Sequence, residues 1–297
     1  MSSFLDWLQF VLAPQMMNGA SIGVAIVLMA LGLTIIFGLL DVINMAHGEF
    51  YAVGAYLGFA LVAAGVGFWL ALALVPLIMA PLGYVTERWL IQRVFHHRER
   101  HILTLLLTFG LAIVIEDVLK LVFGPNPVRL EQPISGASEI VGMHFPNYRL
   151  FMMGVGAAII AAVWMIVYRT NLGAMVRAAA FDRNMAASLG VRVGRVYAGT
   201  FAFGVALAGV SGILLAPVYS VFPTMGRDFI LIAFSVIIVG GMGSIKGAVL
   251  AGLVLTQIEA ISSLYISPVW SEPLLFSVMV AVLMVRPQGL FGRLGHG

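Results

Sequence analysis

The sequence has no cysteine and very little charge. Only 10% of its 297 residues are Asp, Glu, Lys or Arg, whereas a soluble domain carries about 25%. Without cysteine there are no disulfides, thiol nucleophiles or cysteine-bound metals. So few charges cannot cover a surface that faces water, and the mean hydropathy is +1.05. The composition therefore predicts a polytopic membrane protein in contact with lipid, and the net charge of +3 offers no basic face for nucleic acid.

Long apolar runs fill most of the chain. A helix needs about 20 residues to cross a hydrocarbon core of ~30 Å, and several runs approach this length, although some are short or interrupted by glycine. They cover residues 19–40, 48–65, 67–86, 103–123, 150–168, 197–216, 229–243, 247–264 and 273–286. We therefore predict an all-α polytopic fold with about 8–10 transmembrane helices, some broken or short. Residues 1–297 should form a single transmembrane domain, since no connection reaches the roughly 40 residues that an independent soluble fold needs.

Positive charge gathers on one side of the predicted membrane. If the segments alternate in direction, twelve of the sixteen Lys and Arg residues fall on one side: Arg88, Arg93, Arg98, Arg100, Arg169, Arg177, Arg183, Arg192, Arg195, Lys246, Arg286 and Arg293. Loops rich in Lys and Arg stay in the cytoplasm. This side is therefore predicted to be cytoplasmic, with the N-terminus outside.

Polar side chains interrupt the chain between the first two apolar segments, in "GLLDVINMAHGEFYAVGAYLG" (residues 38–58). They are Asp41, Asn44, His47 and Glu49. One interpretation is a solvated turn at the cytoplasmic face, with Asp41 or Asn44 capping the next helix and Glu49 in its first turn. The other is a broken helix that lines a water-filled path, where irregular backbone is tolerated inside a membrane. A metal site is disfavoured, because the i, i+2 spacing of His47 and Glu49 points them to different helix faces.

A second interruption is rich in glycine, in "FSVIIVGGMGSIKGAVLAGLVLT" (residues 234–256). Its glycines permit a tight turn and close helix packing, and they are also candidates for the path or its gate: Gly240, Gly241 and Gly243. The Gly-Lys pair lacks the rest of a phosphate-loop pattern. The "GVSG" at 209–212 fits small residues at helix contacts, since Gly204, Ala208 and Gly212 recur every four positions. We therefore predict no catalytic residue, no metal and no cofactor.

Charged residues also lie inside later apolar segments, among them Glu116, Lys120 and Glu259. Glu116 and Lys120 have the i, i+4 spacing of a helical ion pair. Intramembrane charges usually face a bundle interior or a water-filled cavity, so this pair has either a structural role or a place along a vestibule. The same two interpretations apply to Glu259.

The longest positively charged connection contains a further helical pattern. In residues 169–196, helix-forming residues cover 175–189, with Gly190 as a C-terminal stop. Such a helix suits docking of a cytoplasmic partner through Arg177, Asp182, Arg183, Asn184, Leu189 and Gly190. An ordinary amphipathic helix at the lipid surface is the alternative.

Four stretches together resemble one known family. "GLLDVINMAHGEFYAVGAY", "RAAAFDRNMAASLGV", "GGMGSIKGAVLAG" and "RPQGLFG" are similar to permease subunits of branched-chain amino-acid ABC importers, in the same order along nearly the whole chain. They are most similar to the smaller of the two paired permeases. The resemblance implies a multi-pass protein of the bacterial inner membrane that works with a second permease, two cytoplasmic ATPases and an external solute-binding protein.

The resemblance also implies roles for the segments. The chain would be a permease domain without enzymatic activity, residues 169–196 would be the loop that couples it to an ATPase, and the solute would be a branched-chain amino acid or a related small molecule. The alternative is an ion-coupled secondary transporter or channel that uses Asp41, Glu49, Glu116 or Glu259 as coupling groups.

Overall fold

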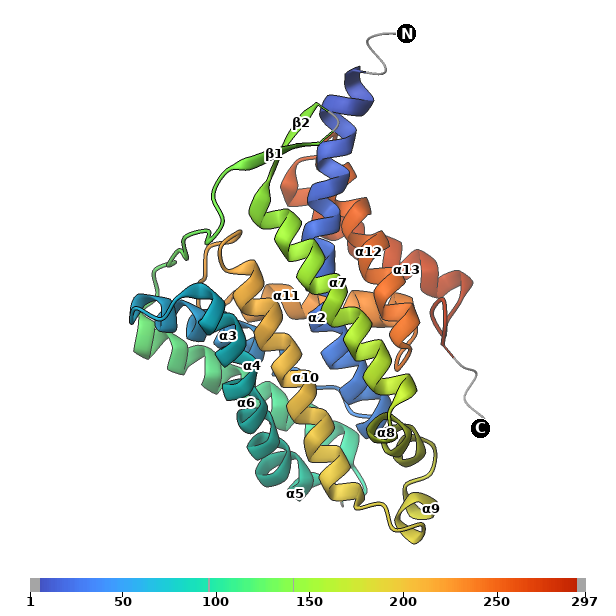
Figure 1. The fold of residues 1–297 in the computed structure, drawn as a ribbon. Helices are drawn as coiled ribbons and strands as arrows, with labels where there is room; N and C mark the ends of the chain where they lie inside the picture. The colour runs from blue at the N-terminus through green and yellow to red at the C-terminus, as the bar shows by residue number, and fades with distance from the viewer. Residues whose placement is uncertain (1–5, 96, 141, 293–297) are drawn as a thin grey trace.

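Helices make up almost all of the chain in the computed structural model, which describes residues 6–95, 97–140 and 142–292 (Figure 1). Each of the nine apolar segments corresponds to a helix: α2 (Ala13–Leu40), α3 (His47–Ala63), α4 (Phe68–Thr86), α6 (Arg100–Phe123), α7 (Asn147–Arg169), α10 (Val193–Leu215), α11 (Met225–Gly240), α12 (Ile245–Ser262) and α13 (Pro268–Val285). The prediction of a polytopic helical fold is confirmed.

Shorter elements extend or connect these helices. They are η1 (Leu8–Leu12) before α2, η2 (Glu87–Ile91) and α5 (Gln92–Val94) after α4, and α8 (Asn171–Phe181) and α9 (Arg183–Ser188) after α7. The connection between α6 and α7 contains a hairpin of β1 (Ala137–Ile140) and β2 (Met143–Pro146), paired antiparallel. Sequence patterning did not predict this hairpin.

Six of the helical runs in the described residues are long and apolar enough to cross a membrane by themselves. The short helices α3 and α11, with 17 and 16 residues, measure only about 25 Å at ~1.5 Å per residue. Both therefore fall short of a ~30 Å hydrocarbon core. The prediction of some short helices is confirmed at these two places.

The centre of the bundle is formed by α2 and α10. In each helix, 83% of the most apolar stretch is buried, and α2 packs against α10, α12 and α7 while α10 packs against α2, α3 and α4 (Figure 1). Small residues allow the close approach, as their spacing predicts: a Cβ at Gly204 would lie 2.8 Å from the carbonyl oxygen of Gly32. The core is therefore held by backbone-to-backbone packing of two central helices.

The two arginine-rich connections meet at one end of the bundle. Figure 1 shows α5, α8 and α9 together at this end, where the rings of Phe95 and Tyr197 contact edge to face at 5.4 Å. We call it the basic end, and the opposite end, which carries β1 and β2, the far end. By the positive-inside rule, the basic end is the one that we expect in the cytoplasm.

Replacing Gly212 with alanine should lower stability. A Cβ there would lie 2.8 Å from the nitrogen of Ala55 and closer still to the carbonyl oxygen of Tyr51, both on α3. Overpacking of this kind costs about 1–3 kcal/mol, so the thermal midpoint of the purified protein should fall. Gly199→Ala is the matched control on the same helix, because open space surrounds Gly199. An equal midpoint for both variants would contradict the close contact of α10 with α3.

Candidate functional site

The chain leaves regular helix immediately after α2. Asp41 has φ 52° and ψ 42°, and it is the one non-glycine residue with positive φ in the described chain. Residues 41–46, which we call the break, form no helix, and they run beside α6. There the Met45 N–H donates to the hydroxyl of Thr108 at 3.1 Å, and the same hydroxyl lies 3.4 Å from the carbonyl oxygen of Ile43. One side chain of α6 thus supports the backbone of the break.

The break extends from the basic end to the middle of the bundle. His47, the first residue of α3, places Nε2 3.1 Å from the carbonyl oxygen of Met29 on α2. Met29 lies eleven residues before Leu40, or about 16 Å along the helix axis at ~1.5 Å per residue. The six residues of the break, together with the side chain of His47, cover this rise. The structure therefore corrects the expectation of a turn at the cytoplasmic face: irregular backbone extends to mid-depth.

Burial separates Asp41 from the other three polar residues. Asp41 is exposed and lies 3.1 Å from Nε2 of His101 and 3.8 Å from the Arg100 guanidinium. Asn44, His47 and Glu49 are 0%, 0% and 3% exposed, and Asn44 Nδ2, His47 Nδ1 and Glu49 Oε2 have no hydrogen-bond partner within the described chain. Buried polar atoms without partners are costly, so these three residues are not those of a solvated turn.

Neither Asp41 nor Asn44 caps α3. The N-cap position is Ala46, which offers no side-chain hydrogen bond, and the Oδ1 atom of Asn44 instead accepts from the Ala46 N–H at 3.1 Å within the break. The capping interpretation is therefore wrong, because Asp41 faces His101 and Arg100 while the side chain of Asn44 bonds the residue before the helix. Glu49 does lie in that first turn, as expected.

The first turns of α3 and α11 meet at this depth. A Cβ at Gly48 would lie 2.7 Å from the Cβ of Ile230, and one at Gly226 would lie 2.6 Å from the carboxylate of Glu49. Glycine at both positions permits the contact. Two short helices thus start side by side in the middle of the membrane, a geometry that transporters use where a solute crosses.

The glycine-rich turn between α11 and α12 lies at the basic end. Gly241 and Gly243 have φ of +99° and +80°, which non-glycine residues rarely adopt. A Cβ at Gly38 would lie 3.2 Å from the Cα of Gly243, so this turn packs beside the last turn of α2. The carbonyl oxygen of Gly240 accepts the N–H of Phe291 at 3.0 Å. Close backbone packing accounts for these three glycines.

Intramembrane charges gather on α6 and α11. Lys120 Nζ lies 2.6 Å from Glu116 Oε1, which confirms the predicted pair, and the Arg227 guanidinium of α11 bonds the other oxygen of Glu116. The partnership with Arg227 was missed, because 111 residues separate the two in sequence. Glu259 is not part of this cluster; it lies in the last turns of α12, where α12 packs against the start of α2.

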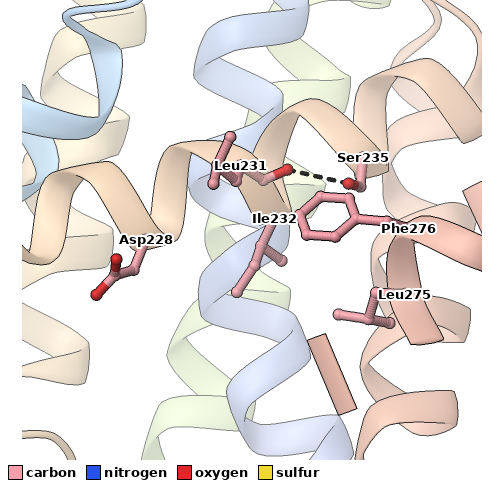
Figure 2. A pocket seen from close by; sticks show the side chains of 6 residues that line it. All are labelled: Asp228, Leu231, Ile232, Ser235, Leu275 and Phe276. Carbon is pink, nitrogen blue, oxygen red and sulfur yellow. Dashed lines mark hydrogen bonds between the residues drawn. The ribbon is translucent and has the colours of Figure 1, made fainter. Parts of the chain in front are cut away.

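A small pocket lies beside this cluster, between α11 and α13 (Figure 2). Its volume is about 30 Å³, and its lining residues are Asp228, Leu231, Ile232, Ser235, Leu275 and Phe276. In Figure 2 the Asp228 carboxylate stands at one edge and Ser235 donates to the Leu231 carbonyl oxygen at 3.0 Å. Such a pocket has room for about one water molecule and no solute.

The coupling-loop prediction of one helix over 175–189 is wrong in one respect. Asp182 divides the segment, because its extended backbone ends α8 and its carboxylate caps α9 by accepting from the N–H groups of Asn184 and Met185 at 2.8 and 2.9 Å. Aspartate favours N-caps over helix interiors. Gly190 ends α9 with φ +87°, as expected.

Exposed apolar side chains follow one another along this loop at intervals of four residues. Phe181, Met185 and Leu189 are 89%, 60% and 79% exposed. Leu189 is one of the predicted docking residues, whereas Phe181 and Met185 were missed. Arg177 instead bonds the carbonyl oxygen of Val167 on α7, which holds α8 against the membrane domain.

One aromatic ring joins this loop to the break. The guanidinium carbons of Arg183 and Arg100 lie 5.4 and 5.1 Å from the ring centroid of Phe95, within cation–π range. Arg100 also faces Asp41, where the break begins. A chain of contacts therefore runs from α9 to the start of the break.

The fold and site define a multi-pass helical permease. The chain matches the family model described as branched-chain amino acid transport system / permease component over residues 15–283, and it belongs to that family. It is accordingly a transport component without catalytic activity of its own. Family membership favours the permease over the ion-coupled transporter.

Similar proteins with known names are also permease proteins of branched-chain amino acid transport systems. The high-affinity branched-chain amino acid transport system permease protein LivH of Escherichia coli (strain K12) is 34% identical, covering 98% of this chain and 97% of LivH. BraD, a permease protein of the same kind from Pseudomonas aeruginosa, is 29% identical, covering 94% of this chain and 95% of BraD. LivM of Escherichia coli is 26% identical over 91% of this chain and 68% of LivM. The matches to both LivH and LivM imply a paired permease.

A solved structure supports the fold. PsaBC from Streptococcus pneumoniae, in complex with Fab, has a chain that superposes with a TM-score of 0.51 and 16% identity, covering 97% of this chain and 96% of that chain. At this identity the similarity concerns the fold alone.

Replacing Asp182 should show whether its carboxylate acts as a cap. Asp182→Ala removes two hydrogen bonds and should destabilise α9 locally by about 1 kcal/mol, while Asp182→Asn should retain most of the capping. Amide hydrogen exchange of residues 183–188 should therefore accelerate in the alanine variant only. Equal exchange in both variants would contradict the capping role.

Proposed function

We propose that this chain is the smaller permease subunit of an ATP-driven ABC importer of branched-chain amino acids in a bacterial inner membrane. A second permease, two cytoplasmic ATPases and an external solute-binding protein complete the transporter. Residues 1–297 form its single transmembrane permease domain. The observation that carries the proposal is the break, because irregular backbone at mid-depth beside two short helices fits a path through a membrane.

The break is the proposed gate. Its backbone donates a hydrogen bond to the hydroxyl of Thr108. The residue that follows it, His47, contacts the carbonyl oxygen of Met29. Few hydrogen bonds must change for such a segment to shift, whereas a continuous helix would lose one bond per residue. Asp41, Asn44, His47 and Glu49 are therefore assigned to the path or gate. Gly240, Gly241 and Gly243 are assigned to the turn that packs beside its base.

Residues 169–196 are the proposed coupling loop. A soluble partner can cover the exposed side chains of Phe181, Met185 and Leu189, since exposed apolar groups that lie close together mark protein contact sites. Asp182, Arg183 and Asn184 belong to the same segment, at the capped start of α9. An ATPase that moves α9 would displace Arg183 from Phe95, and through Arg100 this movement would reach Asp41.

Transport by the reconstituted complex tests this function. With all partner subunits in proteoliposomes, leucine, isoleucine or valine should accumulate only when ATP and the binding protein are present, and a proton gradient should not replace ATP. Omission of this chain is the control and should abolish uptake. Uptake by this chain alone, driven by an ion gradient, would contradict the proposal and support the ion-coupled alternative.

A further inference from the structure

Charges of alternating sign form a row on α6 and α11. Lys120 lies 2.6 Å from Glu116 and 3.3 Å from Asp117, and Arg227 bonds the second oxygen of Glu116. The order is therefore Asp117, Lys120, Glu116, Arg227, with no net charge. We call these four residues the charge row.

The charge row lies between the level of the gate and the far end. Arg227 follows Gly226, whose backbone contacts the first turn of α3, whereas Lys120 lies in the last turn of α6. Glu116 precedes Phe123, the end of α6, by seven residues, or about 10 Å at ~1.5 Å per residue. A charge that faced lipid along this part of the helices would be costly.

Most of the charge row is nevertheless uncovered by this chain. The side chains of Arg227 and Asp117 are 65% and 61% exposed, Lys120 is 38% exposed, and Glu116 is 5% exposed. Lipid cannot solvate these groups, so water or a polar surface must lie against them. The carboxylate of Glu49, with its unpartnered Oε2, is buried behind the row against Gly226.

The two outermost charges keep free hydrogen-bonding capacity. A guanidinium has five N–H donors, and the contact with Glu116 engages one nitrogen of Arg227. The carboxylate of Asp117 contacts Lys120 through Oδ1, which leaves Oδ2 to accept from a ligand. An exposed cation and an exposed anion at the two ends of the row match a molecule that carries both charges.

We propose that the charge row is a solute-facing site for a zwitterionic α-amino acid, with the solute carboxylate on Arg227 and the solute ammonium on Asp117. Glu116 and Lys120 are positioning residues that hold these two groups. The inference rests on the proposed function, since it assigns to the imported solute a site within the same path.

Cysteine accessibility tests whether water reaches the row, and the native chain has no cysteine. Val114→Cys and Leu231→Cys are the reporters. Each position lies one helical turn from the row, and the native side chains of Val114 and Leu231 are 58% and 47% exposed. Leu77→Cys on α4 is the control, at 67% exposure in the middle of an apolar helix. In the complete transporter, a charged methanethiosulfonate should modify both reporters and leave the control unmodified, as read by mass spectrometry of this chain. Unreactive reporters would mean that the partner permease covers the row, and would overturn the inference.

Protection by solutes tests the ligand chemistry. Leucine should slow modification of the reporters, and its analogues without the amino group or without the carboxyl group should each protect about tenfold less well, since each loses one charge-assisted hydrogen bond. Arg227→Gln should abolish the preference for leucine over the amine. Asp117→Asn should abolish the preference for leucine over the acid, and Arg149→Gln, whose guanidinium bonds Asn18 away from the row, should change neither.

The outcomes separate the two proposals. If the unmodified transporter imports leucine but the reporters show no solute protection, or Arg227→Gln and Asp117→Asn retain both preferences, the site assignment is wrong and the proposed function stands. If the unmodified transporter does not import any branched-chain amino acid, the proposed function itself fails.

Discussion

A backbone that leaves the helical conformation inside a membrane must find partners for its N–H and C=O groups, and the rest of this structure depends on how the break meets that requirement. Lipid offers no hydrogen bonds, so each unsatisfied group costs several kcal/mol. Here the hydroxyl of Thr108 on α6 accepts from the Met45 N–H, and the side chain of Asn44 accepts from the Ala46 N–H within the break. Because the first of these contacts comes from another helix, the position of α6 determines whether the break can keep its shape.

Close backbone packing on the other side gives the break a firm frame. α2 and α10 approach each other through Gly32 and Gly204, and α3 approaches α11 through Gly48 and Gly226. A rigid central pair beside a segment with few hydrogen bonds concentrates any movement in the latter. The break is therefore suited to change conformation while α2 and α10 remain in place.

The sequence predicted the helices well because hydrophobic length and the cost of burying charge are local properties. It also predicted the Glu116–Lys120 pair, which needs only i, i+4 spacing. It could not predict that α3 starts at mid-depth, because a polar stretch between two apolar runs looks the same at the surface and inside a bundle. The contact of His47 with Met29 and that of Arg227 with Glu116 are tertiary, and no local pattern encodes them. Asp182 was assigned to a helix interior, although its preference for an N-cap position offered a signal for the division of the loop.

If the break works as a gate, its polar residues serve transport more than folding, and uptake per folded molecule separates these two roles. Asp41→Asn, Asn44→Ala, His47→Ala and Glu49→Gln should be compared with Ser211→Ala, which removes a buried hydrogen bond to Ala25 that lies outside the break. We expect Asn44→Ala and His47→Ala to lose far more transport than abundance, and Ser211→Ala to lose little transport per folded molecule. If all four variants of the break and of the first turn of α3 transport like the unmodified protein, the break is a passive connection and not a gate.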